Sequence, residues 1–235
     1  MSDKLFIPSK YCTSEENAQI ADHLDFNRRH GMEGMVSVLH MRKDGFREIL
    51  PPTHNHIVLT GRRWVMQAVT KRAFSSSIDQ KNWTIEWFGV GSGGALASSP
   101  NVPLDTSDTV TGLSKILDIK PTTIPTGKEH LYTTSAGTHR KRIKCSSTSP
   151  YDSEISMSYN SSTSEVMMLL NLELDYDDCP YDNTQASVSI NELGLYAAST
   201  KETNSVSTLL FSRYTRPTIY KTSGDAYLFM WYIYF

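Results

Sequence analysis

The sequence has little of several features that mark common classes of protein. Its 235 residues hold 23 Lys and Arg against 25 Asp and Glu, so no basic excess points to a nucleic-acid partner. No apolar run approaches the roughly 20 residues that a membrane-spanning helix needs. The N-terminus lacks the charged and apolar regions of a secretory signal. We therefore expect a chain made in a cytoplasm, with no membrane partner and no nucleic-acid partner.

Residues that could hold a metal ion are also sparse. The 3 cysteines share no metal-binding or redox spacing, so we expect unreactive thiols. His54 and His56 fall on one face of a strand, but no third ligand is evident near them. The densest acidic cluster lacks the order of an EF-hand, which favours a solvated turn and leaves a Ca²⁺ site as the alternative. Its members are Asp175, Asp177, Asp178 and Asp182.

One stretch carries a literal dinucleotide-binding pattern. Residues 87–96 read WFGVGSGGAL, in which G-x-G-x-x-G follows a strand-like run. Nucleotide binding needs such glycines to open a helix, whose N-terminal N–H groups hold the pyrophosphate. Serines and prolines over residues 98–103 leave little room for that helix. We predict a tight exit from a core strand, with structural roles for Gly89 and Gly91 and no cofactor. No G-x-S-x-G or similar motif occurs, so we also expect no enzyme activity.

Strand-forming residues dominate the rest of the chain. It holds 12 Tyr, 4 Trp and 8 Phe and many Ser and Thr, a composition typical of strands and turns. Short strands separated by turn residues favour a mainly β fold, an antiparallel β-sandwich, over alternating βα units. The predicted strands cover residues 83–90, 128–134, 138–146, 152–160, 164–175, 186–197, 206–214 and 226–235.

The N-terminal part predicts a helix and a hairpin. Thr13 and Glu16 fit a capping box that starts a short helix. Asp44-Gly45 between two alternating runs is a hairpin signal, and two prolines then interrupt the chain. We predict that residues 1–52 form an N-terminal extension, a helix and hairpin arm.

Residues 60–74 predict the clearest helix, packed on the sandwich and capped by Thr60. It belongs to a β-sandwich domain over residues 53–235, which also contains a long loop at residues 91–127. The apolar face of this helix comprises Trp64, Val65, Ala68 and Val69.

A basic run, HRKRIK, occupies residues 139–144. On a strand, Arg140, Arg142 and Lys144 would face one way, with His139 and Lys141 opposite. Such a strand could contact phosphate, an acidic partner subunit or water, and the sequence leaves these alternatives open.

Several short motifs follow one another in a fixed order. They are NHI at residues 55–57 before Thr60-Gly61, WFGVGSG at 87–93, SINELGLY at 189–196, LLFSR at 209–213, and IYK at 219–221 before YLFMWYIYF at 227–235. In order and spacing, this pattern resembles a diffuse family of tailed-bacteriophage virion proteins. The resemblance covers residues 55–235 and implies a non-enzymatic component of the tail, baseplate, neck or fibre attachment. It also implies that the glycine loop is structural.

The resemblance leads to a functional prediction. We expect a virion structural protein located in the tail region, whose partners are other virion proteins and copies of itself. The alternative is a carbohydrate- or receptor-binding β-sandwich module at the virion tip. Such a module would use exposed aromatic side chains near acidic ones, and the candidates are Trp83, Tyr176 and Tyr181.

Glu192 is the most conspicuous charged residue in these motifs. It shares a strand face with Ile190 and Tyr196, and an unpaired carboxylate there would be costly to bury. Arg213, in the next predicted strand, is the natural bidentate partner. We predict this pair and favour an internal bridge, with a subunit contact as the alternative.

The last strand, residues 227–235, is apolar on both faces, which a one-sided antiparallel strand does not need. Either a packed sheet and helix 60–74 cover its two faces, or one face meets a neighbouring subunit. Trp231 and Phe235 are therefore interface candidates. We also expect the carboxyl end to be packed into the fold.

Overall fold

The structure is a computed structural model that describes residues 6–27, 33–71, 83–105, 107, 109–121, 123, 126, 131–135, 138–143, 155–161, 165–179, 186–198 and 208–235. The fold is mainly β, and every strand pair among these residues is antiparallel. The mainly β, antiparallel fold class predicted from the sequence is confirmed. Neither helix within these ranges has the length and apolar character to cross a membrane.

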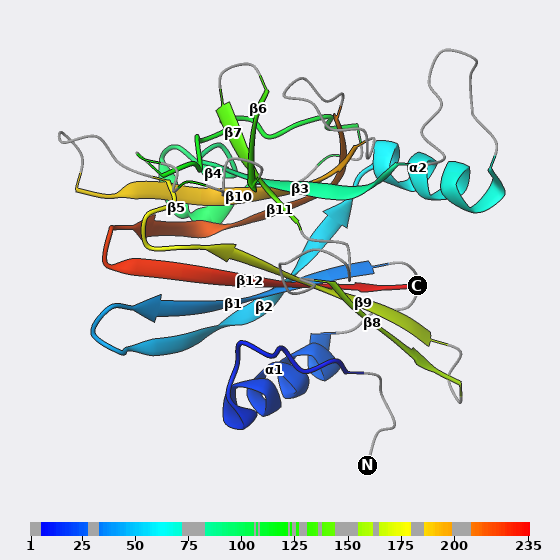
Figure 1. The fold of residues 1–235 in the computed structure, drawn as a ribbon, viewed down its shortest axis with the longest axis horizontal. Coiled ribbons are helices and arrows are strands. Elements are labelled where there is room, and N and C mark those ends of the chain that lie inside the picture. Colours follow the sequence, from blue (N-terminus) through cyan, green and yellow to red (C-terminus); the bar gives the residue numbers. More distant parts are fainter. Residues whose placement is uncertain are drawn as a thin grey trace. The chain divides into compact units, whose positions relative to one another are not determined.

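Two compact units are interleaved along the chain (Figure 1). Unit 1 comprises Met1–Asn55, Lys144–Tyr176 and Gly224–Phe235, and unit 2 comprises His56–Ile143 and Asp177–Ser223. The sequence suggested a single division between residues 52 and 53. That position falls inside β2 (Arg47–Ile57), a strand that begins in unit 1 and ends in unit 2.

Unit 1 is built on five strands in the order β2-β1-β12-β9-β8. Its other strands are β1 (Glu33–Arg42), β8 (Ile155–Asn160), β9 (Glu165–Leu174) and β12 (Asp225–Tyr234). The β1–β2 hairpin turns at Asp44-Gly45 as predicted, and Gly45 has a φ of 92°, a conformation that favours glycine. β1 pairs with β12 along its whole length, from Glu33↔Tyr234 to Arg42↔Asp225. The hairpin is therefore part of the unit 1 sheet, whereas the sequence suggested an arm.

Helix α1 (Ser14–Asn27) begins at the predicted capping box. The Thr13 N–H donates to Glu16 Oε2 at 2.8 Å, and the Glu16 N–H donates to Thr13 Oγ1 at 3.2 Å. Arg47 of β2 donates from Nε to Glu16 Oε1 at 2.8 Å. The capping residue thus also ties the helix to the hairpin.

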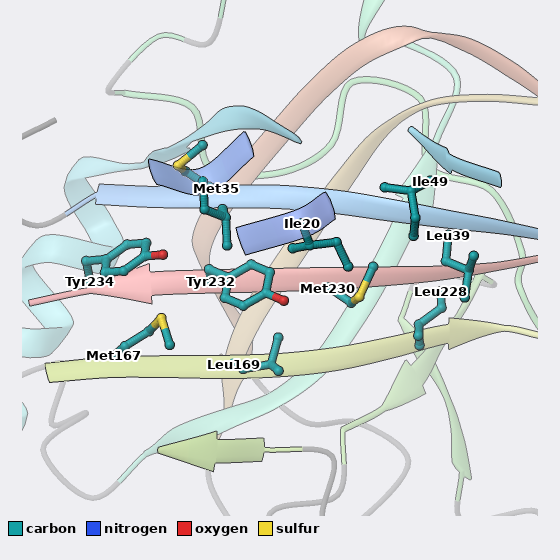
Figure 2. Packing of buried hydrophobic residues seen from close by; sticks show 11 residues of the cluster. Ile20, Met35, Leu39, Ile49, Met167, Leu169, Leu228, Met230, Tyr232 and Tyr234 are labelled. Atoms are coloured by element: carbon teal, nitrogen blue, oxygen red, sulfur yellow. The ribbon is translucent and has the colours of Figure 1, made fainter. Parts of the chain in front are cut away.

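The core of unit 1 lies between α1 and its sheet. Figure 2 shows Ile20 of α1 packed with Met230 and Tyr232 of β12, among residues of β1 and β9. On the other face of β12, three side chains are also 0% exposed: Phe229, Trp231 and Ile233. β12 is therefore a central strand buried on both faces, the first of the two predicted arrangements. α1 covers the face of β12 that carries Met230 and Tyr232, a role that the sequence assigned to helix 60–74.

Two strands continue through prolines, although the sequence predicted an interruption at Pro51 and Pro52 and an end of the later strand at residue 214. β2 passes through Pro51 and Pro52 where its pairing with β1 shifts register, between Val36↔Thr53 and Val38↔Leu50. β11 (Thr208–Lys221) passes through Pro217 at a second register shift, between Ile190↔Ile219 and Glu192↔Thr215. Irregular pairing tolerates proline because no ladder hydrogen bond is needed there. The predicted end of this strand at residue 214 was therefore too early.

Unit 2 contains a sheet in the order β6-β7-β3-β10-β11, and the end of β2 pairs with β11. Its strands are β3 (Thr84–Gly91), β6 (Tyr132–Ser135), β7 (Thr138–Arg142), β10 (Val188–Ala198) and β11. The core of this unit includes Val58, Trp87, Tyr196 and Leu210. A small hairpin of β4 (Ala95–Leu96) and β5 (Ser99–Pro103) follows β3.

Helix α2 (Leu59–Thr70) lies in unit 2 and overlaps the predicted helix 60–74, but it ends at Thr70, because Lys71 is its C-cap with a φ of 54°. Residues 72–74 lie outside the described residues. Its details differ from the prediction. Thr60 does not cap the helix, because its hydroxyl donates to the carbonyl of Leu210 at 2.8 Å and the N-cap position is Val58. Val69, assigned to the apolar face, is 75% exposed. Gly61 is buried instead, and a Cβ there would lie 2.1 Å from the carbonyl oxygen of Phe211, so glycine permits close packing of α2 on β11.

Candidate functional site

Three of the motifs meet at Glu192, inside unit 2. β10 places this residue opposite Gly91 of β3 on one side and Thr215 of β11 on the other. The register shift beside Ile190 lies next to it, and such irregularities re-aim side chains. The Glu192 side chain is 0% exposed and that of its partner, Arg213, is 5% exposed.

The predicted Glu192–Arg213 ion pair is confirmed, with a different geometry. Arg213 donates from both Nη2, at 2.6 Å, and Nε, at 3.1 Å, to the same oxygen, Glu192 Oε2. Nη2 also donates to the hydroxyl of Ser114 at 3.0 Å. The pair is therefore not the fork that was predicted, in which two donors meet two oxygens. Its burial within one chain agrees with the internal bridge favoured from the sequence.

Backbone N–H groups complete the environment of the carboxylate. Those of Gly93 and Lys115 donate to Oε1 at 3.1 and 2.8 Å, and that of Ser114 donates to Oε2 at 3.1 Å. The neighbouring Asn191 side chain accepts from the Gly94 N–H at 2.6 Å. We call Glu192, Arg213 and these three carboxylate donors the Glu192 cage.

The glycine loop is shaped to fit around this carboxylate. A Cβ on Gly91 would lie 2.5 Å from Glu192 Oε1 and 2.6 Å from the Lys115 carbonyl oxygen. A Cβ on Gly94 would lie 2.3 Å from the Asn191 carbonyl oxygen. Gly89 is different, because its nearest neighbour would be a side-chain carbon of Tyr196 at 3.4 Å. Close approach of the backbone therefore explains Gly91 and Gly94, but not Gly89.

The G-x-G-x-x-G pattern contacts the Glu192 carboxylate of the same chain. The glycines lead into β4 and β5 instead of a helix, so the loop lacks the helix N-terminus on which pyrophosphate binding depends. Its N–H groups face a carboxylate of the same chain. Two arginine donors and three backbone donors use the roughly four acceptor directions of that carboxylate. Glu192 is thus held as a structural tie between β3, β10, β11 and the loop that contains Ser114.

Comparisons with protein-family models, with curated proteins and with solved structures find no match for this chain. The resemblance to virion proteins therefore stays a prediction that depends on the order of the motifs. The geometry of the Glu192 cage is independent of it.

The described side chains of the basic run, residues 139–142, contact acidic or aromatic side chains of unit 2. His139 Nδ1 lies 3.0 Å from Asp118 Oδ1, and Lys141 Nζ lies 2.5 Å from Asp178 Oδ2. Arg142 pairs with Glu86 at 3.2 Å. Arg140 lies over the ring of Tyr196 at 3.7 Å, and burial lowers its pKa. Each of these four side chains has a partner in the same unit, an arrangement that the sequence did not indicate. Lys144 lies outside the described residues.

The acidic cluster is not a uniformly solvated turn. Asp178 is 2% exposed and accepts from the hydroxyl of Tyr132 at 2.6 Å as well as from Lys141. Asp175 is exposed, and Asp182 lies outside the described residues. The two histidines considered as metal ligands lie in β2. His54 is opposite Met35 of β1 in the strand register, and His56 is opposite Arg213 of β11. Among residues within the described ranges, no three His, Cys, Asp or Glu side chains are grouped to hold a metal ion.

The described cysteines are protonated thiols at neutral pH. Burial raises the pKa of Cys12 to about 11 and also raises the pKa of the buried Cys179. Because the thiolate is the reactive form, neither side chain has the character of a nucleophile.

The aromatic candidates for carbohydrate binding are only partly described. Trp83 and Tyr176 are half-buried, and the ammonium of Lys43 lies 5.2 Å from the ring centroid of Tyr176. Tyr181 lies outside the described residues.

Of the two interface candidates in the last strand, Trp231 is fully buried and Phe235 is not. Trp231 is 0% exposed, so it takes part in the fold of the chain itself. The Phe235 N–H donates to the Val166 carbonyl at 3.0 Å, whereas its side chain is 45% exposed. The carboxyl end is thus fastened through its backbone and leaves an aromatic ring at the surface.

Sequence reasoning missed the contribution of the long loop to the cage. The Ser92 N–H donates to the Lys115 carbonyl at 2.9 Å, and the Leu117 N–H donates to the Val90 carbonyl at 2.9 Å. These bonds bring Ser114 and Lys115 to Glu192. Both residues donate through backbone N–H groups, which every residue but proline has, so side-chain identity gave no signal.

Proposed function

We propose that this chain is a non-catalytic structural protein of a tailed-bacteriophage virion, assembled in the tail region through contacts with copies of itself and with other virion proteins. The observation that carries the proposal is the convergence of three motifs of the resemblance on the Glu192 cage. WFGVGSG supplies the glycine loop, SINELGLY supplies Glu192, and LLFSR supplies Arg213. In this reading the role of the motifs is to build the scaffold.

The chemistry of the cage supports an architectural role. A buried ion pair contributes little net stability against apolar packing, but removing one partner is costly. Such a group therefore favours one pairing of β3, β10 and β11 over other registers. A subunit that must present the same surfaces in every copy of a particle benefits from this specificity. No bond is made or broken in the proposed role.

Quantitative mass spectrometry of purified, intact particles of the encoding phage tests the proposal. We expect the chain at a fixed copy number per virion, a multiple of the symmetry of the tail or neck, measured relative to the major capsid protein. Host proteins carried through the purification provide the background level. A chain at or below that background would overturn the proposal. Binding of the purified protein to a glycan array would instead favour the carbohydrate-binding alternative.

A further inference from the structure

The outer strand of the unit 1 sheet, β8, has an unusual edge. Among the described residues it pairs only with β9, in a continuous register from Ile155↔Leu170 to Asn160↔Glu165. Its sequence, ISMSYN, contains no charged residue, proline or glycine. Proteins usually protect exposed edges with lysines, prolines or bulges, because an open edge pairs with other strands. β8 has none of these devices.

One face of this edge is apolar and exposed. Met157 is 76% exposed and Tyr159 is 61% exposed, on the same face of β8. Val166, opposite Tyr159 on β9, is 38% exposed, and Phe235, whose N–H bonds to the Val166 carbonyl, is 45% exposed. We call these four residues the edge patch. Single exposed apolar side chains are ordinary, but adjacent ones next to an open edge mark an interaction surface.

We propose that β8 pairs antiparallel with β8 of a second copy of the chain, about a two-fold axis perpendicular to the sheet. Charge is the reason for choosing a second copy. A strand with no charged residue meets no like charge when it faces itself, whereas a charged partner would find nothing on β8 to pair with. A two-fold contact also needs only one surface, which both copies supply.

The pairing restricts the possible registers. Residues directly opposite each other in an antiparallel pair point to the same face of the sheet. Odd-numbered residues of β8 therefore face odd-numbered residues of the second copy, so Met157 lies opposite Ile155, Met157 or Tyr159. Ser156 and Ser158 then lie opposite even-numbered residues of the second strand. The edge patches of the two copies then lie on the same face of the joined sheet and form one continuous patch.

This inference names a contact for the proposed assembly role and depends on that role only for its biological meaning. The particle analysis tests the role, whereas the oligomeric state of the purified chain tests the contact. A chain that forms the dimer but is absent from virions would separate the two.

Sedimentation velocity of the full chain over a range of concentrations is the experiment. We expect a dimer for the unmodified chain, and for Met157→Lys a dissociation constant at least about tenfold higher, because two like charges become neighbours (a factor of ten is about 1.4 kcal/mol). Val69→Lys is the matched control: Val69 is 75% exposed on α2, so its change adds the same charge at the same exposure. It should leave the dimer unchanged, and circular dichroism should show both variants folded.

A mixing experiment distinguishes self-pairing from a general effect of charge. Met157→Lys and Met157→Glu should each dimerise more weakly alone than the unmodified chain, and should form a heterodimer when mixed. A monomeric unmodified chain would overturn the proposal. So would a dimer that Met157→Lys leaves intact, equal dissociation by Val69→Lys, a closed ring larger than a dimer, or no heterodimer in the mixture.

Discussion

Units 1 and 2 bury different kinds of side chain. Among the described residues, the buried charged side chain of unit 1 is Asp225. Those of unit 2 are Glu86, Arg140, Asp178, Glu192, Arg213, Arg216 and Lys221. Unit 1 instead joins α1 to its sheet through Ile20, Met230, Tyr232 and other apolar residues (Figure 2). One unit is organised by apolar packing, and the other adds a network of buried ions.

This difference separates stability from specificity. Apolar packing tolerates changes that keep volume and pattern, so the core of unit 1 can vary while its fold is kept. A buried ion pair tolerates few substitutions, because removal of one partner leaves the other charge buried without an opposite charge. Unit 2 should therefore respond sharply to single changes at the Glu192 cage, and the following substitutions test that contrast.

Arg213→Ala should have the largest effect. It leaves the buried Glu192 carboxylate with backbone donors alone, and we expect the free energy of unfolding to fall by about 3–5 kcal/mol. Urea unfolding followed by circular dichroism measures the loss. Arg42→Ala is the control, because Arg42 pairs with Asp44 but its side chain is 51% exposed, and such pairs contribute about 1 kcal/mol or less. Equal effects of the two changes would remove the contrast between buried and exposed ion pairs.

Two glycines of the same motif should behave differently. In Gly91→Ala, the new methyl group would meet Glu192 Oε1 and the Lys115 carbonyl, and we expect a loss of about 1–3 kcal/mol. Gly89→Ala places its methyl group at ordinary contact distance from the Tyr196 and Arg140 side chains and should be nearly neutral. The same unfolding measurement compares them. A tolerated Gly91→Ala would mean that the loop can withdraw from Glu192 without cost.

The sequence was sufficient where local chemistry decides the structure. Capping at Thr13 and Glu16, the turn at Asp44-Gly45 and the pairing of Glu192 with Arg213 were all predicted and are all present. Each depends on side chains whose preferences are strong and specific. The last strand was found for a similar reason, since its apolar pattern is continuous.

The sequence was insufficient where the partner is backbone or lies far along the chain. Three donors of the Glu192 cage are backbone N–H groups, which carry no side-chain signal. The partners of Lys141 and Arg142 lie 37 and 56 residues away. Pro51, Pro52 and Pro217 hid the length of two strands, because pairing irregularities that accommodate proline are set by the neighbouring strand.

A small predicted effect concerns the ion pair between Glu16 and Arg47 in unit 1. The hydrogen bond from Arg47 is the main cause that holds the pKa of Glu16 below its ordinary value. A carboxyl group whose pKa is depressed by folding contributes its stability above the unfolded-state pKa, about 4.3, and loses it as pH falls through the folded-state pKa. Glu16→Gln removes this charge but keeps an oxygen that can accept from the Thr13 N–H. At pH 7 the variant should therefore be less stable by about 1 kcal/mol or less.

The pH dependence decides whether charge is the cause. Urea unfolding of both proteins between pH 7 and pH 3 should show the difference in free energy shrinking below about pH 4, as Glu16 becomes protonated in both the folded and the unfolded chain. A Glu16→Gln difference that stays constant down to pH 3 would show that the Glu16 charge is not the cause of the lost stability.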